Sequence, residues 1–197
     1  MPRQTRQQVE EQIVDRAAAL FAQHGFAHTS LQAIADAVGY SKAGLLHHFP
    51  SKEALHAAAE ALTQARIQRV LDAVADLPVG PERDRYALEE LVDWAFASPG
   101  QTALGLSMLP LLAGDDPFPT QGEDGVPILR VFGVVPGAGD PERLVRVVSA
   151  LSGLLVTALV ATHSGVQASW RDPILTTALD ALGHRRPSAS PLVHAEA

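Results

Sequence analysis

The chain has 197 residues, of which 47% are hydrophobic, and a formal net charge of −7 at pH 7. It contains no cysteine, which excludes disulfides and thiolate-bound metals and suits a reducing cytoplasm, where we expect the protein to act. Residues 1–10 are polar and lack the apolar segment of a signal peptide. The first 55 residues carry five basic and five acidic side chains, so the acidic excess lies in the remainder.

An amphipathic pattern covers residues 8–24. Its apolar positions recur at spacings of three and four: Val9, Ile13, Ala17, Leu20 and Phe21. This spacing predicts a helix with one apolar face, and Gly25 is expected to end it.

A second pattern, over residues 29–49, predicts two short helices joined by a tight turn. Thr29 and Gln32 have the spacing of a capping box, which predicts a helix that starts there and ends at Val38. Gly39 is expected to adopt positive φ in the turn, and Ser41 to cap a second helix that ends near Phe49. With the preceding helix, this predicts a three-helix unit whose last helix has one free side.

This stretch resembles the DNA-binding end of the TetR family of transcriptional regulators. The residues that match the family pattern are Thr29, Ile34, Ala35, Gly39, Ser41, Leu45, His48, Phe49, Lys52 and Leu55. Three positions depart from it: Val38 replaces the usual Ala, Tyr40 the usual Val, and Leu46 a Tyr that usually contacts a phosphate. The resemblance is strong only over the first quarter of the chain.

Candidate DNA contacts follow from the expected recognition helix. Lys42 is the best candidate for reading a base, because lysine donates to guanine O6 and N7. Ala43 and Gly44 would allow close approach to bases, and Gln32 either reaches a base edge or closes the capping box. The phosphate and sugar candidates are Thr29, Ser30, Ser41, His47, His48 and Lys52. His48 is equally well interpreted as part of the core.

The rest of the chain is predicted to be helical. We expect helices over residues 52–76, 82–97, 101–112, 140–163 and 173–182, with Asp140 and Asp172 as N-caps before proline. Residues 114–125 read as a loop, and 126–135 are ambiguous between helix and strand, with a helix fitting better. The predicted domains are 1–51 and 52–184, followed by a disordered tail over 185–197.

Two uncharged runs raise the question of a membrane span. Residues 97–114 are interrupted by proline and glycine, and 147–162 hold about 16 residues, fewer than the roughly 20 that a span requires. Both runs are therefore interpreted as helices buried between other helices.

The resemblance implies a larger C-terminal helical domain for ligand binding and dimerisation. Its bulky residues are either core filling or the lining of a cavity for a small apolar or aromatic effector: Trp94, Phe96, Met108, Phe118, Phe132, His163 and Trp170. Small and β-branched residues on the last two long helices predict a four-helix bundle between two copies. The dimer candidates are Val148, Leu151, Leu155, Ala158, Leu175 and Leu179.

The sequence gives little support for metal binding or enzymatic activity. The histidines His24, His28, His47 and His48 are not spaced to share one metal ion, and no nucleotide-binding loop or nucleophile elbow is present. We therefore expect no metal, no cofactor and no enzymatic activity.

The sequence thus predicts an all-α regulator that binds a near-palindromic operator as a homodimer, usually represses, and is released by a small molecule. The alternative is a helical protein-interaction module without sequence-specific DNA binding. The operator, the effector and the choice between repression and activation are not specified by the sequence.

Overall fold

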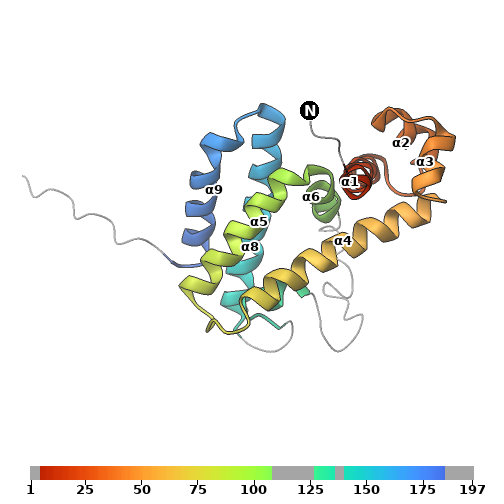
Figure 1. Cartoon of the computed structure of the whole chain (residues 1–197). Helices are drawn as coiled ribbons and strands as arrows, with labels where there is room; N and C mark the ends of the chain where they lie inside the picture. The colour runs from red at the N-terminus through yellow and green to blue at the C-terminus, as the bar shows by residue number, and fades with distance from the viewer. Residues whose placement is uncertain (1–4, 108–126, 136–139, 185–197) are drawn as a thin grey trace, which may run out of the picture.

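The computed structural model describes residues 5–107, 127–135 and 140–184, which form an all-α protein (Figure 1). The helices in chain order are α1 (Arg6–His24), α2 (Leu31–Val38), α3 (Lys42–His48), α4 (Lys52–Ala73), α5 (Pro81–Ala97), α6 (Pro99–Ser107), α7 (Pro127–Val131), α8 (Pro141–Ser164) and α9 (Gln167–Ala181). An N-terminal helix-turn-helix unit and a larger helical body are therefore present, as the sequence predicts. The expected tail over 185–197 and loop over 114–125 lie outside the described residues.

The N-terminal core is built by α1, α2, α3 and the beginning of α4. Ile34, Leu45 and Leu55 are fully buried there, and Phe21 and Ala59 are nearly so. These side chains come from four helices and meet because each helix has one apolar face at helical spacing. The predicted boundary between residues 51 and 52 therefore falls at the start of α4, while the core that it was meant to enclose continues to Ala59.

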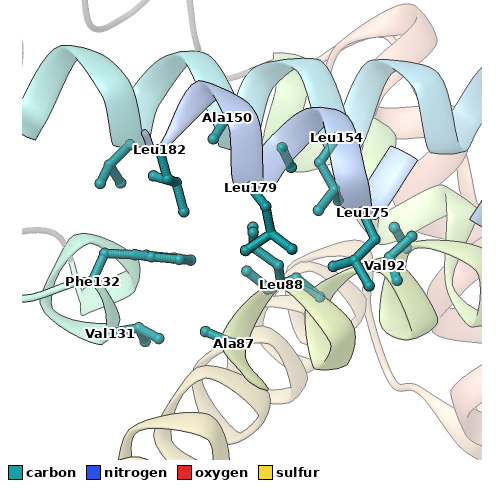
Figure 2. Packing of buried hydrophobic residues seen from close by; sticks show 14 of the residues in the cluster. Ala87, Leu88, Val92, Val131, Phe132, Ala150, Leu154, Leu175, Leu179 and Leu182 are labelled. Carbon is teal, nitrogen blue, oxygen red and sulfur yellow. The ribbon is translucent and has the colours of Figure 1, made fainter. Parts of the chain in front are cut away.

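The body has a second apolar core, formed by the end of α4 together with α5, α7, α8 and α9. Figure 2 shows Phe132, which follows α7, pointing into this core, where Leu88 of α5 and Leu179 of α9 also lie. Residues 127–131 form the short helix that was preferred over a strand. Since α4 contributes to both cores, it runs from the N-terminal unit to the far side of the body (Figure 1).

A buried carboxylate joins three parts of the body. Asp84 of α5 is fully buried, and its two oxygens lie 2.7 Å from Nη2 of Arg143 on α8. His184, beyond α9, places Nε2 2.6 Å from Oδ2 of Asp84. A buried charge needs such partners, because an unpaired carboxylate away from water is strongly destabilising.

α8 is longer than the uncharged run suggests. It covers 24 residues, because Asp140 caps it by accepting a hydrogen bond from the Glu142 amide and Pro141 occupies its first position. Among the described residues, α8 is the one helix long and apolar enough to cross a membrane by length and composition. The argument that the uncharged run is too short to cross a membrane was therefore wrong, because the helix extends beyond that run. Core helices of soluble proteins nevertheless also meet the criteria of length and composition.

The start of α9 differs from the prediction. Asp172 does not cap a helix, because α9 already begins at Gln167 and Pro173 lies inside it. Arg171 explains the difference: its guanidinium makes two hydrogen bonds, of 2.7 and 2.8 Å, to the carboxylate of Asp93 on α5. This contact holds the first turns of α9 against α5, although proline removes one helical hydrogen bond.

The Asp93–Arg171 pair should make a small, pH-dependent contribution to stability. Hydrogen bonding to Arg171 holds the pKa of Asp93 below its usual value of 3.8, so the contribution is present above that pH and is lost as the pH falls through the lowered value. Both side chains are substantially exposed, so we expect Asp93→Asn to lower the free energy of unfolding by about 1 kcal/mol or less at pH 7. Urea titrations of both proteins at pH 7 and pH 3 would measure this, and a difference that grows on acidification would contradict it.

Candidate nucleic-acid interface

The turn between α2 and α3 has the predicted geometry. Gly39 adopts φ 75° and ψ 23°, the left-handed conformation, and the amide of Tyr40 donates to the carbonyl of Ala35 at 2.9 Å. Ser41 then caps α3, since its Oγ accepts a hydrogen bond of 3.0 Å from the Gly44 amide. Glycine is favoured at this turn because side chains rarely adopt positive φ. These local bonds define the angle at which α3 leaves α2.

α3 buries one face and presents the other to solvent. Leu45 is fully buried against Ile34 and Ala35 of α2, which are also fully buried. The side chains exposed on the other face are Lys42, Ala43, Leu46 and His47. In Figure 1, α2 and α3 lie at the end of the molecule away from α9. A helix with a free face at the end of a molecule is the geometry by which helix-turn-helix proteins enter the major groove.

Gly44 lies in α3 and packs against the turn that precedes this helix. It is half-buried, and a Cβ atom built on it would lie 3.3 Å from both Ser41 Oγ and Tyr40 Cδ1. The missing side chain therefore makes room for the cap and for Tyr40. The expectation that Gly44 allows close approach to bases stays a prediction.

Thr29 is also corrected. It is buried, and its hydroxyl donates to the carbonyls of Gly25 at 2.8 Å and Leu20 at 3.2 Å, which leaves it unavailable to a phosphate. Ser30 caps α2 instead, accepting from the Ala33 amide at 3.1 Å. The N-cap is therefore Ser30 and not Thr29, and the predicted Thr29–Gln32 capping box was wrong.

Gln32 does not take part in capping α2. It is exposed, and its Nε2 donates to Oδ1 of Asp36 at 2.8 Å, one turn further along the helix. Of the two roles left open for Gln32, the structure removes the capping box, and the contact to a base edge stays a prediction.

Two basic residues expected at phosphates are engaged within the protein. His48 is half-buried, with Nδ1 3.4 Å from Oε1 of Glu10 and its ring edge-on to Tyr40 at 5.6 Å between centroids. Lys52 donates to the carbonyl of Phe26 at 2.7 Å, with its Nζ 4.3 Å from the Phe26 ring centroid. Both side chains therefore stabilise the N-terminal unit. For His48, this is the role in the core that the sequence analysis gave as its alternative.

Sequence reasoning missed Glu10 as a partner in this unit. Its carboxylate accepts a hydrogen bond of 2.8 Å from Nε of Arg6 as well as facing His48. These two partners lower the pKa of the Glu10 carboxyl. The Arg6–Glu10 pair could have been predicted, because residues four apart on a helix lie on the same face. The contact with His48 could not, because it joins residues 38 positions apart.

The effector candidates are not gathered around one cavity in the described part of the chain. Phe132 is fully buried in the body core, and Trp94 and Phe96 pack against that core. His163 and Trp170 are exposed near the junction of α8 and α9. Met108 and Phe118 lie outside the described residues. The structure therefore assigns Phe132 to core filling and separates it from His163 and Trp170.

A surface groove of about 350 Å³ runs between α8 and α9. It is lined by Ser149, Ala150, Gly153, Leu154, Thr157, Trp170, Pro173, Ile174, Thr177, Ala178 and Ala181. Beside it, α8 exposes Val145, Val156 and Val160, at 64%, 48% and 46% of their surfaces. The outer face of α8 and α9 is thus largely apolar and uncovered within a single chain.

Half of the predicted dimer residues point inward instead. Ala158, Leu175 and Leu179 are 0%, 6% and 5% exposed in the body core, so those predictions were wrong. The other three, which are Val148, Leu151 and Leu155, are half-buried along the edge of that core. The choice of α8 and α9 as interface helices stays a prediction. Because α8 is apolar on both sides, its sequence did not show which side faces out.

No group of three or more His, Asp or Glu side chains in residues 5–107, 127–135 and 140–184 is arranged to hold a metal ion.

Comparisons with known proteins bear on this geometry. Residues 13–59 match the family model of bacterial regulatory proteins, tetR family. A comparison with curated protein sequences gives no match.

Three solved structures are similar in part. AmtR of Mycobacterium smegmatis is 23% identical, with 95% of this chain and 92% of that chain covered at a TM-score of 0.41. A Shewanella sp. PV-4 protein assigned to the tetR family of transcription regulators is 21% identical, with 88% and 95% covered at 0.39. A structure described as the molecular basis for control of antibiotic production by bacterial hormones is 19% identical, with 92% and 98% covered at 0.40.

The matched segment contains the turn at Gly39, the cap at Ser41 and the buried anchor Leu45, which are the features that present α3. Residues 13–59 therefore form the DNA-binding helix-turn-helix unit of the TetR family of bacterial regulatory proteins.

Proposed function

We propose that the protein is a transcriptional repressor that binds a near-palindromic operator as a homodimer and is released by a small molecule. The observation that carries the proposal is the free face of α3, where Lys42, Ala43 and His47 are exposed while Leu45 anchors the helix. Lys42 lies in the first turn of α3, the part of a recognition helix that reaches base edges. Lysine there would donate to guanine, and Ala43 would contact a thymine methyl group.

The phosphate contacts are proposed for residues that remain accessible. Ser30, Ser41 and His47 are exposed at the starts of α2 and α3 and at the end of α3. Backbone amides at a helix start, together with hydroxyl groups, favour an anion. These contacts would fix the register of the protein on DNA without specifying a sequence.

Dimerisation is proposed through the outer face of α8 and α9. The exposed valines Val145, Val156 and Val160, together with the groove beside Trp170, form an apolar surface that a second copy would cover. Two helices from each subunit would form a four-helix bundle. The two α3 helices would then have to lie about 34–36 Å apart, or a multiple of that distance, to enter successive major grooves.

Release by an effector is proposed to act through α4. Leu55 and Ala59 of this helix lie in the N-terminal core, and Val70 and Val74 at its far end lie in the body core. A small apolar or aromatic molecule that binds one packing of the body better than another would shift the position of α4. The spacing of the two recognition helices would change as a result.

The DNA-binding part is tested by Lys42→Ala in gel-shift titrations with the gene's own upstream DNA. We expect a loss of about 1–3 kcal/mol in binding free energy for the cognate site, because one bidentate base contact is removed. Arg85→Ala, which removes the same charge from the exposed surface of α5, is the matched control and should bind like the wild type. Circular dichroism would show that both variants are folded.

The alternative is a helical module that recruits a protein partner without reading DNA sequence. It predicts that operator and scrambled DNA of equal length bind equally well and that Lys42→Ala changes neither. That result would remove the proposed function while leaving the fold assignment unaffected.

A further inference from the structure

α6 lies directly against α1, and their backbones touch at one point. Gly100, in the first turn of α6, is buried there. A Cβ atom built on Gly100 would overlap the carbonyl oxygen of Asp15 and come within 3.1 Å of the Ala19 amide nitrogen. Because the overlapping atoms belong to the α1 backbone, no side-chain rotation could relieve the clash. Glycine at position 100 is therefore required for this packing, although its φ is ordinary.

The same point carries a hydrogen bond between the two helices. The backbone amide of Gln101 donates to Oδ1 of Asp15 at 2.9 Å, so a carboxylate of the DNA-binding unit caps a helix of the body. Burial raises the pKa of the Asp15 carboxyl, although hydrogen bonds from the Gln101 and Gly100 amides lower it. The side chain is thus half-buried where it makes this contact.

α6 is tied to further parts of the N-terminal unit. Oγ1 of Thr63 on α4 donates to Oε1 of Gln101 at 3.3 Å. Leu104, one turn further along α6, packs against the N-terminal core. At its other side, α6 contacts α5, because the buried hydroxyl of Thr102 lies 3.5 Å from the carbonyl oxygen of Ala95 on α5.

We infer that the contact of Asp15 with Gly100 and Gln101 is a latch that sets the angle between the DNA-binding unit and the body. α4 alone would leave the unit free to swing about a single helix. The latch adds a second attachment, on α1, and two attachments define an orientation. Resting on the proposed function, the latch controls operator affinity, because the orientation of each unit determines the spacing of the recognition helices in the dimer.

The orientation can be measured directly, because the chain has no cysteine of its own. Cysteines introduced at two exposed positions, Ala33 on α2 and Glu82 on α5, would carry spin labels on the unit and on the body. Doubly labelled protein diluted into unlabelled protein would report the distance within one chain by pulsed electron paramagnetic resonance. The measurement requires neither DNA nor an effector.

Gly100→Ala would add a Cβ atom between α6 and the α1 backbone, and Gly105→Ala is its matched control. A Cβ atom at Gly105, on the same helix, would meet nothing within 4 Å. We expect Gly100→Ala to shift or broaden the distance distribution and to lower operator affinity about tenfold, a usual magnitude for coupling between sites. Gly105→Ala should leave both unchanged.

Asp15→Ala and Asp15→Asn give a second, milder pair that does not force the backbones apart. Asparagine keeps an oxygen that can accept from the Gln101 amide, so it should preserve the distance, whereas alanine removes the acceptor and should broaden it. Folded Gly100→Ala and Asp15→Ala proteins with the wild-type distance would overturn the latch. A shifted distance with unchanged operator affinity would overturn its control of DNA binding, and wild-type protein that ignores operator sequence would overturn the proposed function instead.

Discussion

Replacing Asp84 with alanine should lower the free energy of unfolding by about 3–5 kcal/mol, the usual result of breaking a buried ion pair from one side. Asp84 is fully buried, and its loss leaves Arg143 without the carboxylate that it contacts at 2.7 Å. Nε of Arg143 is already buried without a hydrogen-bond partner, so the guanidinium would keep only the 3.2 Å hydrogen bond from Nη2 to the Phe132 carbonyl to offset its burial. His184 would lose its 2.6 Å contact at the same time, which should loosen the end of α9. Urea denaturation followed by circular dichroism measures the change.

The control for this prediction is Asp93→Ala. Asp93 also pairs with an arginine, at 2.7 Å, but 52% of its side chain is exposed. Removing an exposed pair costs about 1 kcal/mol or less, because water replaces the partner. If the Asp84 variant lost no more stability than the Asp93 variant, the buried contact would not hold α5, α8 and the end of α9 together as we describe.

Glutamate at Val156 and Val160 together should convert the proposed dimer into monomers and abolish tight operator binding. These side chains are 48% and 46% exposed in the single chain, so the fold should tolerate the change. In the dimer, each carboxylate would be buried without a partner, which costs several kcal/mol. We expect the dissociation constant of the dimer to rise at least about 100-fold, which is equivalent to about 2.8 kcal/mol of lost binding free energy. Light scattering across a concentration series measures the dissociation.

Val135→Glu is the control for this second prediction. Val135 is 55% exposed, follows α7 and belongs to neither α8 nor α9. It should leave both the dissociation constant and the operator affinity unchanged. A paired variant that stays dimeric would place the interface elsewhere, and a monomer that still binds the operator tightly would show that dimerisation is unnecessary for recognition.

Much of the DNA-binding unit could be predicted from the sequence because its signals are local. Gly39 ends α2, Ser41 caps α3, and Leu45 meets Ile34 within a span of 12 residues. In each case the deciding interaction is a backbone conformation, a hydrogen bond three residues away or a contact between adjacent helices. Such interactions leave their pattern in the order of neighbouring residues.

The partners of other candidate site residues could not be predicted, for the opposite reason. Lys52 donates to Phe26, and His48 lies beside Glu10, at separations of 26 and 38 residues. Nothing next to a lysine or a histidine in the sequence shows whether its partner is a phosphate or another part of the chain. Thr29 is similar, since the carbonyls of Leu20 and Gly25 become its acceptors only when α1 ends nearby.

The sequence alone determined that this protein is all-helical, that residues 29–49 form a helix-turn-helix, and that α8 begins at Asp140–Pro141, because short-range hydrogen bonding and backbone preference decide these features. Only the tertiary structure decided that Ala158 and Leu179 face inward, that α9 begins before Pro173, and that Asp15 caps α6. Those features depend on which surfaces meet, and a helix that is apolar on two sides has no preferred inner face until its neighbours are in place.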